Sequence, residues 1–183
     1  MAPKPTLSAD GWLSGVRIAH SPNQDERPAG EDIRLLVIHA ISLPPGRFGG
    51  DDVERFFANR LDPAGHPYYR GIHDLKVSAH FFIRRTGEMV QFVPVTHRAW
   101  HSGVSNWRGR ERCNDFSIGI ELEGCDERSF TGRQYVRLAR LIRLLQRRFP
   151  IEDIAGHADI APGRKTDPGP QFDWQRLRDL LSR

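Results

Sequence analysis

The chain has 183 residues, of which 38% are hydrophobic, and this length and composition predict a single domain with a buried core. It has no run of eighteen apolar residues and no apolar stretch typical of a secretory signal near its N-terminus, so neither a transmembrane helix nor export is expected. The net charge of +4 permits an anionic partner without requiring one.

The N-terminal part of the chain is predicted to contain a surface segment followed by a buried strand. Residues 1–30 are rich in Pro, Asp and Ser and are expected to wrap the surface. Residues 34–41 predict a strand, because residues 35–38 form an unbroken apolar run of β-favouring length. A Pro/Gly loop over residues 43–50 follows it.

A short helix and a hairpin are predicted next. Asp51 and Asp52 can cap a helix, and its apolar side chains are Val53, Phe56 and Phe57. Residues 77–84 and 89–93 have strand composition, and the Thr86-Gly87 pair between them favours a tight turn. We therefore expect two antiparallel strands in this region.

The second half of the chain is predicted to contain one strand and two helices. Residues 117–123 alternate as a strand does. Thr131 can cap a long helix that Pro150 ends; its apolar positions, at helical spacing, are Tyr135, Leu138, Ile142, Leu145 and Phe149. Residues 172–181 predict a final helix. This mixed order indicates an α/β domain, with one central mixed sheet flanked by helices.

The segment from residue 156 to residue 170 holds the chain's densest group of reactive side chains. His157, Lys165 and Asp167 lie in a Pro/Gly-rich stretch that we interpret as a stiff loop. Pro168 favours an extended backbone at Asp167. A histidine and a carboxylate held in this way are suitable ligands for zinc, and Lys165 could face whatever the metal binds.

His39 is the histidine that best completes such a site. It stands at the end of the apolar strand, where a buried polar group is costly unless it has a partner. Strand ends in α/β domains open onto the loops that carry function. His39, His157 and Asp167, with a water molecule, would make an open tetrahedral zinc site.

The predicted strand at residues 117–123 presents two carboxylates on one face. Ile118, Ile120 and Leu122 alternate with Ser117, Gly119, Glu121 and Glu123. One interpretation is a solvent-exposed sheet face; the other is a general base beside a metal-bound water. The period of two does not choose between Glu121 and Glu123.

The remaining histidines are interpreted more simply. His20, His66 and His73 have the surroundings of surface or turn residues, and His80 fits a hydrogen-bonded core residue. His97 and His101, on either side of Trp100, could line a pocket.

Arginines recur at helical spacing between residues 137 and 148. A nucleic-acid stripe is one interpretation, and a solvated helix face is the one we favour. No aromatic residues interleave these arginines, as a single-strand binder would require. We therefore predict no nucleic-acid partner and no membrane partner.

Six separated blocks, in order, closely resemble a known enzyme family. They are residues 35–39, 41–46, 77–80, 98–101, 114–124 and 156–169, and the likeness extends over about residues 11–174. The chain resembles the zinc-dependent N-acetylmuramoyl-L-alanine amidases, and among them the cytosolic AmpD branch, the 1,6-anhydro-N-acetylmuramyl-L-alanine amidases.

The resemblance implies a fold, a metal site and a reaction. The fold is the amidase/peptidoglycan-recognition fold, and one Zn²⁺ would be held by His39, His157 and Asp167. Glu121 would be the catalytic base and Lys165 the electrophilic partner. The substrate would be a muropeptide from cell-wall recycling, cut between the lactyl group of anhydro-muramic acid and L-alanine. The same recycling suggests a link to β-lactamase induction.

Substrate contacts are expected from three further residues. Arg112 and Lys76 could bind stem-peptide carboxylates, and Trp100 could pack on the ligand. Ala40 departs from the family pattern, because relatives commonly have asparagine directly after the first zinc histidine. Substrate preference is therefore less firmly predicted than metal binding.

Two other functions remain open alongside the recycling enzyme. One is a binding module that recognises wall fragments without cutting them, and the other is a lytic amidase that acts on intact peptidoglycan. Without a predicted signal peptide, Cys113 and Cys125 fit reduced thiols, and we expect a cytoplasmic monomer.

Overall fold

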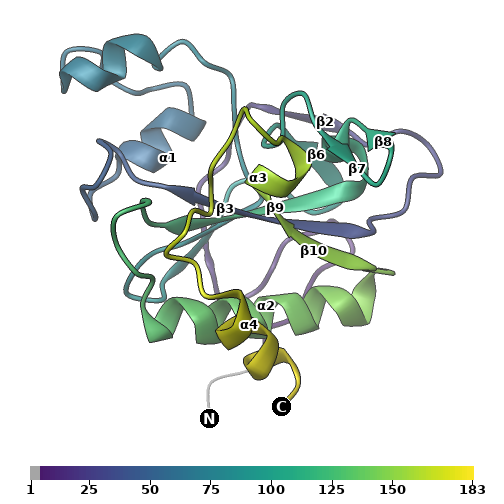
Figure 1. Ribbon diagram of the computed structural model, residues 1–183. Helices are drawn as coiled ribbons and strands as arrows, with labels where there is room; N and C mark the ends of the chain where they lie inside the picture. The colour runs from purple at the N-terminus through teal and green to yellow at the C-terminus, as the bar shows by residue number, and fades with distance from the viewer. Residues whose placement is uncertain (1–4) are drawn as a thin grey trace.

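The computed structural model describes residues 5–183, and a six-stranded mixed sheet runs through the middle of this part of the chain (Figure 1). Its strands, in spatial order, are β1 (Arg17–Ile18), β5 (Met89–Gln91), β4 (Phe81–Ile83), β9 (Ser117–Glu123), β3 (Leu35–Ile41) and β10 (Asp153–Gly156). The strands β4, β9, β3 and β10 pair in parallel, whereas β5 runs antiparallel to β4.

The helices are divided between the two faces of this sheet. The long helix α2 (Gly132–Arg148) and the C-terminal helix α4 (Trp174–Leu181) lie together on one face, and α1 (Asp52–Phe57) and α3 (His157–Ile160) lie on the other (Figure 1). Two short 3₁₀ helices, η1 (Pro67–Gly71) and η2 (Cys113–Phe116), complete the helices. The pairs β2 (Gln24–Glu26) with β6 (His97–Ala99) and β7 (Asn106–Trp107) with β8 (Arg110–Glu111) form two small sheets.

The helix α2 forms where the sequence predicts it. The Thr131 side chain accepts from the Gln134 backbone N–H and the Gln134 side chain accepts from the Thr131 N–H, a complete capping box. Its apolar stripe packs on the sheet, with Leu138, Ile142 and Leu145 fully buried. Burial of this stripe, more than helix propensity, stabilises the helix.

Alternation along β3 and β9 assigns their side chains to opposite faces. Leu36 and Ile38 pack under α2, together with Ile118 and Ile120 of β9. His39 and the odd-numbered residues of β9 therefore project to the face that carries α1 and α3. The fold thus separates an apolar face from a face that holds polar groups.

Four expectations require correction. In the described part of residues 1–30, the chain does more than wrap the surface: β1 forms an edge of the central sheet and Leu13 is buried in the core. Asp51 stands at the start of α1 but makes no capping bond, and its carboxylate lies 3.5 Å from Arg84 Nη2. The part of the surface-segment prediction that falls on residues 1–4 lies outside the described residues.

The other two corrections concern strands. The hairpin is confirmed, but β4 begins only at Phe81, because the backbone of Ser78 pairs with the Trp100 carbonyl instead of a strand. The strand β10 was not predicted. It is four residues long and pairs with the buried β3, so its sequence shows no strong alternation to detect.

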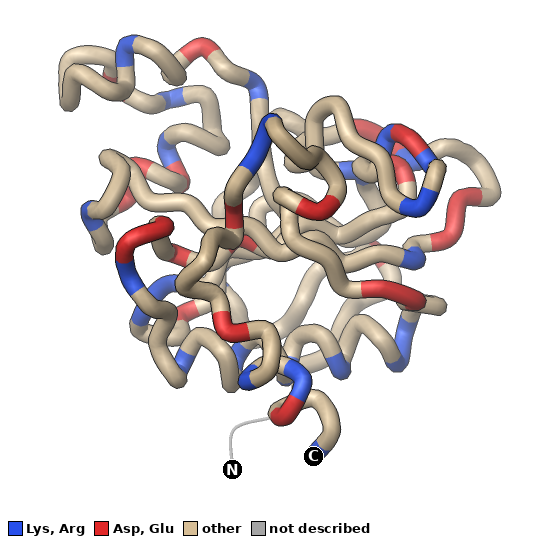
Figure 2. The backbone as a smooth tube through the Cα atoms, viewed as in Figure 1, with Lys and Arg blue, Asp and Glu red and all other residues tan. Residues whose placement is uncertain are grey.

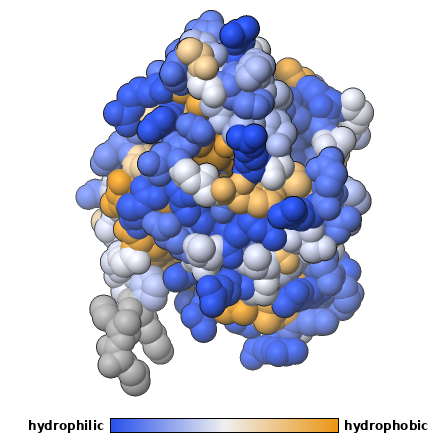
Figure 3. All heavy atoms as spheres, turned by 90° about the vertical axis from the view of Figure 1, so that its left-hand side faces the viewer, coloured by the Kyte–Doolittle hydropathy of each residue, from blue (hydrophilic) through white to orange (hydrophobic). Residues whose placement is uncertain are grey.

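Figure 2 marks the basic residues along α2, of which Arg140, Arg147 and Arg148 are exposed and Arg137 and Arg143 are half-buried. Two of them bond within the chain: Arg137 Nε donates to the Gly87 carbonyl and Arg143 donates to the Leu180 carbonyl. The side of the molecule nearest α1 is mainly hydrophilic, with smaller hydrophobic patches (Figure 3). Within residues 5–183, no helix has the length and apolar character needed to cross a bilayer.

Candidate functional site

His39, His157 and Asp167 meet in a tight triangle on the α3 side of the sheet. The Nδ1 atoms of His39 and His157 are 3.0 Å apart. The Asp167 Oδ2 atom lies 3.2 Å from His39 Nδ1 and 3.1 Å from His157 Nδ1. Three ligand atoms from positions up to 128 residues apart thus converge on one point.

Local structure fixes each corner of this triangle. His39 stands inside β3, and His157 is the first residue of α3, directly after β10, so it is not in the loop that the sequence suggested. The Asp159 carboxylate accepts from the Gly156 N–H and holds the start of that helix. The Asp167 carbonyl accepts from the Ala158 N–H at 2.8 Å, which returns the loop to the helix.

The protonation states of the triangle suit a cation. Burial lowers the pKa of His39 to about 4, so its ring is neutral at pH 7. Burial alone would raise the pKa of Asp167, but hydrogen bonds from His157 and His39 hold it below its usual range. Two imidazoles and one carboxylate form a ligand set of catalytic zinc sites.

The spacing of the three atoms also fits zinc. Ligands at about 2.0–2.1 Å from a tetrahedral zinc ion lie about 3.3 Å from one another. The three observed separations of 3.0, 3.1 and 3.2 Å form one nearly equilateral face of such a tetrahedron. The residues present therefore fit the metal that the resemblance implies.

The structure distinguishes the two carboxylates of β9. Both oxygens of Glu123 accept backbone N–H groups, from Gly49 and Arg85, so this residue anchors loops. Glu121 is buried and its Oε2 has no hydrogen-bond partner among the described residues. Burial, and then the charge of Asp167, raise the pKa of Glu121 well above its ordinary value, while Lys165 opposes this. A buried carboxylate with a free oxygen and a raised pKa has the properties of a candidate general base, and Glu121 has all three.

Of the two interpretations of the β9 face, the solvent-exposed one is wrong. The face is buried, not solvent-exposed, and the space above Gly119 is filled by the ring of His101. His101 was expected only to line a pocket, but its Nδ1 atom lies 2.9 Å from Nε2 of His39. The available signal was its place in the block at residues 98–101. Ser102, whose carbonyl contacts His157, was missed altogether.

Lys165 is the exposed member of the group. Its positive charge lowers the pKa of both Glu121 and His39. Its loop is held by Asp126, whose carboxylate accepts from the Thr166 hydroxyl. Lys165 can therefore approach a ligand from the solvent side.

The three predicted substrate contacts lie outside the triangle. Arg112 is largely exposed, pairs with Asp115 at 3.2 Å, and lines a 530 Å³ hollow with Arg164 and the end of α3. Trp100 is half-buried and Lys76 is exposed. Within residues 5–183, no hydrogen bond or ion pair joins these three side chains to the triangle.

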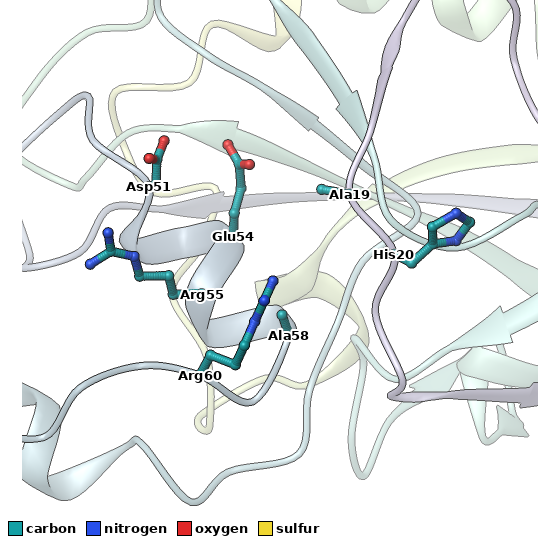
Figure 4. Close-up of a pocket in the computed structure, with 7 residues that line it drawn as sticks. All are labelled: Ala19, His20, Asp51, Glu54, Arg55, Ala58 and Arg60. Atoms are coloured by element: carbon teal, nitrogen blue, oxygen red, sulfur yellow. The ribbon is translucent and has the colours of Figure 1, made fainter.

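A second hollow lies beside α1 and contains none of the predicted site residues (Figure 4). Its acidic side chain Glu54 is neutralised by Arg17 and Arg84, each at 2.5 Å. No residue of the triangle lines this hollow, and we assign it no role.

Residues 29–170 match the family model described as N-acetylmuramoyl-L-alanine amidase. The 1,6-anhydro-N-acetylmuramyl-L-alanine amidase AmpD of Citrobacter freundii is 54% identical over 96% of this chain and 95% of its own length. These comparisons span the whole site.

Two solved structures are similar in fold as well. The crystal structure of a selenomethionine AmpD derivative has a TM-score of 0.93 and 54% identity, over 96% of this chain and 99% of that chain. The amidase AmiD from Escherichia coli has a TM-score of 0.60 and 30% identity, over 95% of this chain and 65% of that chain. That structure is a complex with anhydro-N-acetylmuramic acid-L-Ala-D-γ-Glu-L-Lys.

Proposed function

The chain belongs to the N-acetylmuramoyl-L-alanine amidase family, as its six sequence blocks indicated, and we propose that its substrates are 1,6-anhydro muropeptides released from the cell wall. The enzyme hydrolyses the amide bond between the lactyl group of N-acetylmuramic acid and L-alanine. The observation that carries the proposal is the triangle of His39, His157 and Asp167 beside the unpartnered carboxylate of Glu121.

We assign His39, His157 and Asp167 as the ligands of one Zn²⁺. When bound there, zinc would supply the Lewis acidity that activates water and polarises a carbonyl. Asp167 is the most exposed of the three side chains, at 19%, and Lys165, two residues before it in the chain, is exposed. A substrate amide can enter from the side of these two residues.

Glu121 is the proposed general base. Its free Oε2 can accept a proton from the attacking water, and the same oxygen can then donate that proton to the leaving alanine nitrogen. Burial raises the pKa of Glu121, so its carboxylate holds a proton more readily than an exposed glutamate does. General acid–base catalysis of this kind contributes about 10²–10⁴-fold in rate.

Lys165 is the proposed electrophilic partner. Negative charge develops on the lactyl carbonyl oxygen as water adds to its carbon. The ammonium group of Lys165 can stabilise that charge, and the loss of one such donor costs about 2.7–4 kcal/mol in comparable sites. Its exposure in the free protein leaves it able to meet the substrate.

The stem peptide is assigned to the hollow beside α3. Arg112 and Arg164 border it, and α3 begins with His157, so the hollow lies within a few residues of the metal triangle. Arginine binds carboxylates in a bidentate manner. Lys76 and Trp100 remain proposed substrate contacts. Ala40 packs with the core under α2, so its methyl group does not face His39.

A cytoplasmic monomer that recycles wall fragments, and so limits β-lactamase induction, is the setting that we propose. The curated relative is named for 1,6-anhydro muropeptides, and that product of wall turnover is a small soluble ligand that suits this site. No nucleic acid or membrane is required by the proposed reaction. The non-catalytic module is disfavoured because every proposed ligand and the base are present.

A mass-spectrometric assay tests the proposal. The zinc-loaded protein is incubated with anhydro-muramyl tripeptide and, in parallel, with intact peptidoglycan. Release of free tripeptide from the small fragment alone is expected. Release from intact wall would instead identify a lytic amidase, and binding without cleavage of either would identify a recognition module.

A further inference from the structure

His101 and Ser102 lie directly behind the two imidazoles of the proposed metal site. The His101 Nδ1 atom is 2.9 Å from His39 Nε2, and the Ser102 carbonyl oxygen is 3.3 Å from His157 Nε2. In each imidazole, the contacted nitrogen is the one that does not belong to the triangle. Two consecutive residues therefore support both histidines.

The hydrogen bonds beyond His101 have a single consistent direction. The Cys113 carbonyl can only accept, so the Ser117 hydroxyl, 2.5 Å away, donates to it. The Ser117 oxygen then accepts from His101 Nε2, at 3.2 Å. In a neutral imidazole the other nitrogen is an acceptor, so His101 Nδ1 accepts from His39 Nε2–H.

This chain of bonds determines which nitrogen of His39 is free. With its proton on Nε2, His39 has its lone pair on Nδ1, the atom in the triangle. His157 is in the same tautomer, because its Nε2 contacts the Ser102 carbonyl oxygen directly. A carbonyl oxygen can only accept, so Nε2 of His157 must carry the proton. Both histidines are thus set to ligate through Nδ1.

His101 and Ser102 are themselves held in place by neighbouring residues. The Asn114 side-chain oxygen accepts from the backbone N–H groups of His101 and Ser102, at 3.1 and 2.9 Å, and from the Ser102 hydroxyl at 2.7 Å. On its other side, the His101 ring lies against Gly119, where a Cβ atom would come within 2.4 Å of Cγ. His101 is 8% exposed and has little room to rotate.

We propose that His101 is a positioning residue that fixes His39 in the tautomer required for metal binding, while the Ser102 carbonyl, anchored by Asn114, does the same for His157. This inference rests on the proposed metal site. Second-sphere partners of ligating histidines typically change metal affinity by about 10–100-fold when removed. His101 and Ser102 lie outside the triangle and would act on the metal only through His39 and His157.

Matched substitutions at His101 separate this role from packing. His101→Asn places an acceptor oxygen at the position of Nδ1, whereas His101→Gln places polar atoms only near Nε2, and His101→Phe keeps the ring alone. Zinc affinity of the full-length chain is measured by competition with a chromophoric chelator, together with thermal unfolding of the metal-free proteins. His97→Asn is the control, because that ring bonds Gln24 and does not touch the triangle.

We expect His101→Phe and His101→Gln to lose about 10–100-fold in zinc affinity, with His101→Asn and the control close to the parent. Equal losses in the Asn and Gln variants, or unchanged affinity in a folded Phe variant, would overturn the proposal. Failure of the Phe variant to fold leaves the Asn and Gln pair to decide. A parent chain that binds no zinc would overturn the metal site itself, a different result from bound zinc with unaffected variants.

The tautomers of the parent protein provide a second readout. Long-range ¹H–¹⁵N spectra of the imidazole rings should show protons on Nε2 of His39, His101 and His157. A proton on Nδ1 of His101 would contradict the proposal, whatever the affinities are.

Discussion

His39 and Glu121 are register partners in the adjacent parallel strands β3 and β9. Both side chains are buried on the face opposite α2. Because backbone hydrogen bonds fix this pairing, the distance between the proposed ligand and the proposed base does not depend on a loop. Only His157, Lys165 and Asp167 are brought to the site by the segment that follows β10.

Glu121→Gln should abolish most of the turnover and leave zinc binding intact. The amide keeps the shape of the side chain but cannot take a proton from water, so we expect kcat to fall by about 10²–10⁴-fold. The unfolding free energy should not decrease, since the variant no longer buries an ionisable carboxyl without a partner. Tripeptide release and zinc titration measure the two effects.

Glu123 provides the matched control for this experiment. Its two oxygens accept from backbone groups of two loops, so Glu123→Gln should lose stability, by about 1–3 kcal/mol, and retain turnover per folded molecule. Full activity in the Glu121 variant, or equal losses of activity in both, would refute the assignment.

Lys165→Met should reduce kcat about 10²–10³-fold, corresponding to one lost donor to the developing oxyanion. Zinc affinity should remain close to that of the parent, because the ammonium group is not a ligand. Steady-state kinetics on anhydro-muramyl tripeptide provide the test. A rise in KM with unchanged kcat would place Lys165 in ground-state binding instead.

Removal of the metal should abolish activity and lower the melting temperature. The triangle of His39, His157 and Asp167 exists only in the folded chain, so zinc at 100 times its Kd should stabilise the protein by about 2.7 kcal/mol. Calorimetry before and after dialysis against a chelator gives the shift. Asp167→Ala should remove it, and a zinc-dependent shift that survives in this variant would locate the ion elsewhere.

Gly119→Ala should destabilise the protein and weaken zinc binding together. The added methyl would lie 2.4 Å from His101 Cγ, so the ring behind His39 must move, at a cost of about 1–3 kcal/mol. Gly71→Ala is the control, because nothing lies within 4 Å of its added Cβ. Denaturant unfolding and zinc titration of both variants measure the two losses. Equal losses of stability and zinc affinity in the two variants would contradict the prediction.

The metal-free protein should lose stability as the pH falls below 6.5. Burial, and then the charge of Arg27, lower the pKa of His80 to about 3, so between pH 6.5 and pH 3 the unfolded chain binds a proton that the folded chain excludes. Stability is complete above pH 6.5 and falls by about 1.4 kcal/mol per pH unit for one such ring. Urea unfolding at several pH values measures the slope.

The variant His80→Asn should reduce the dependence of the unfolding free energy on pH by the contribution of about one proton. Its oxygen can still accept from the Gly119 N–H, as His80 Nδ1 does at 3.0 Å, so the fold is expected to persist. An unchanged slope would show that other groups, such as His39, account for the acid sensitivity.

The sequence by itself determined the elements whose signals are local. The apolar run at residues 35–38 predicted β3, and the capping residue and stripe of α2 predicted that helix, since backbone propensity and periodic burial are written in neighbouring residues. The short β10 could not be found in this way, because only its pairing with β3 makes it a strand.

The site residues also fall into those that the sequence could predict and those that only the tertiary structure distinguishes. The family blocks indicated His39, His157, Asp167, Glu121 and Lys165, but alternation along β9 could not separate Glu121 from Glu123. Tertiary structure distinguishes the two carboxylates and so supports Glu121 as the proposed base, because loops distant in sequence supply N–H groups to Glu123 and none to Glu121 Oε2. It alone also placed His101 behind His39. Burial and hydrogen-bond partners depend on which segments meet in space, and no local pattern records that.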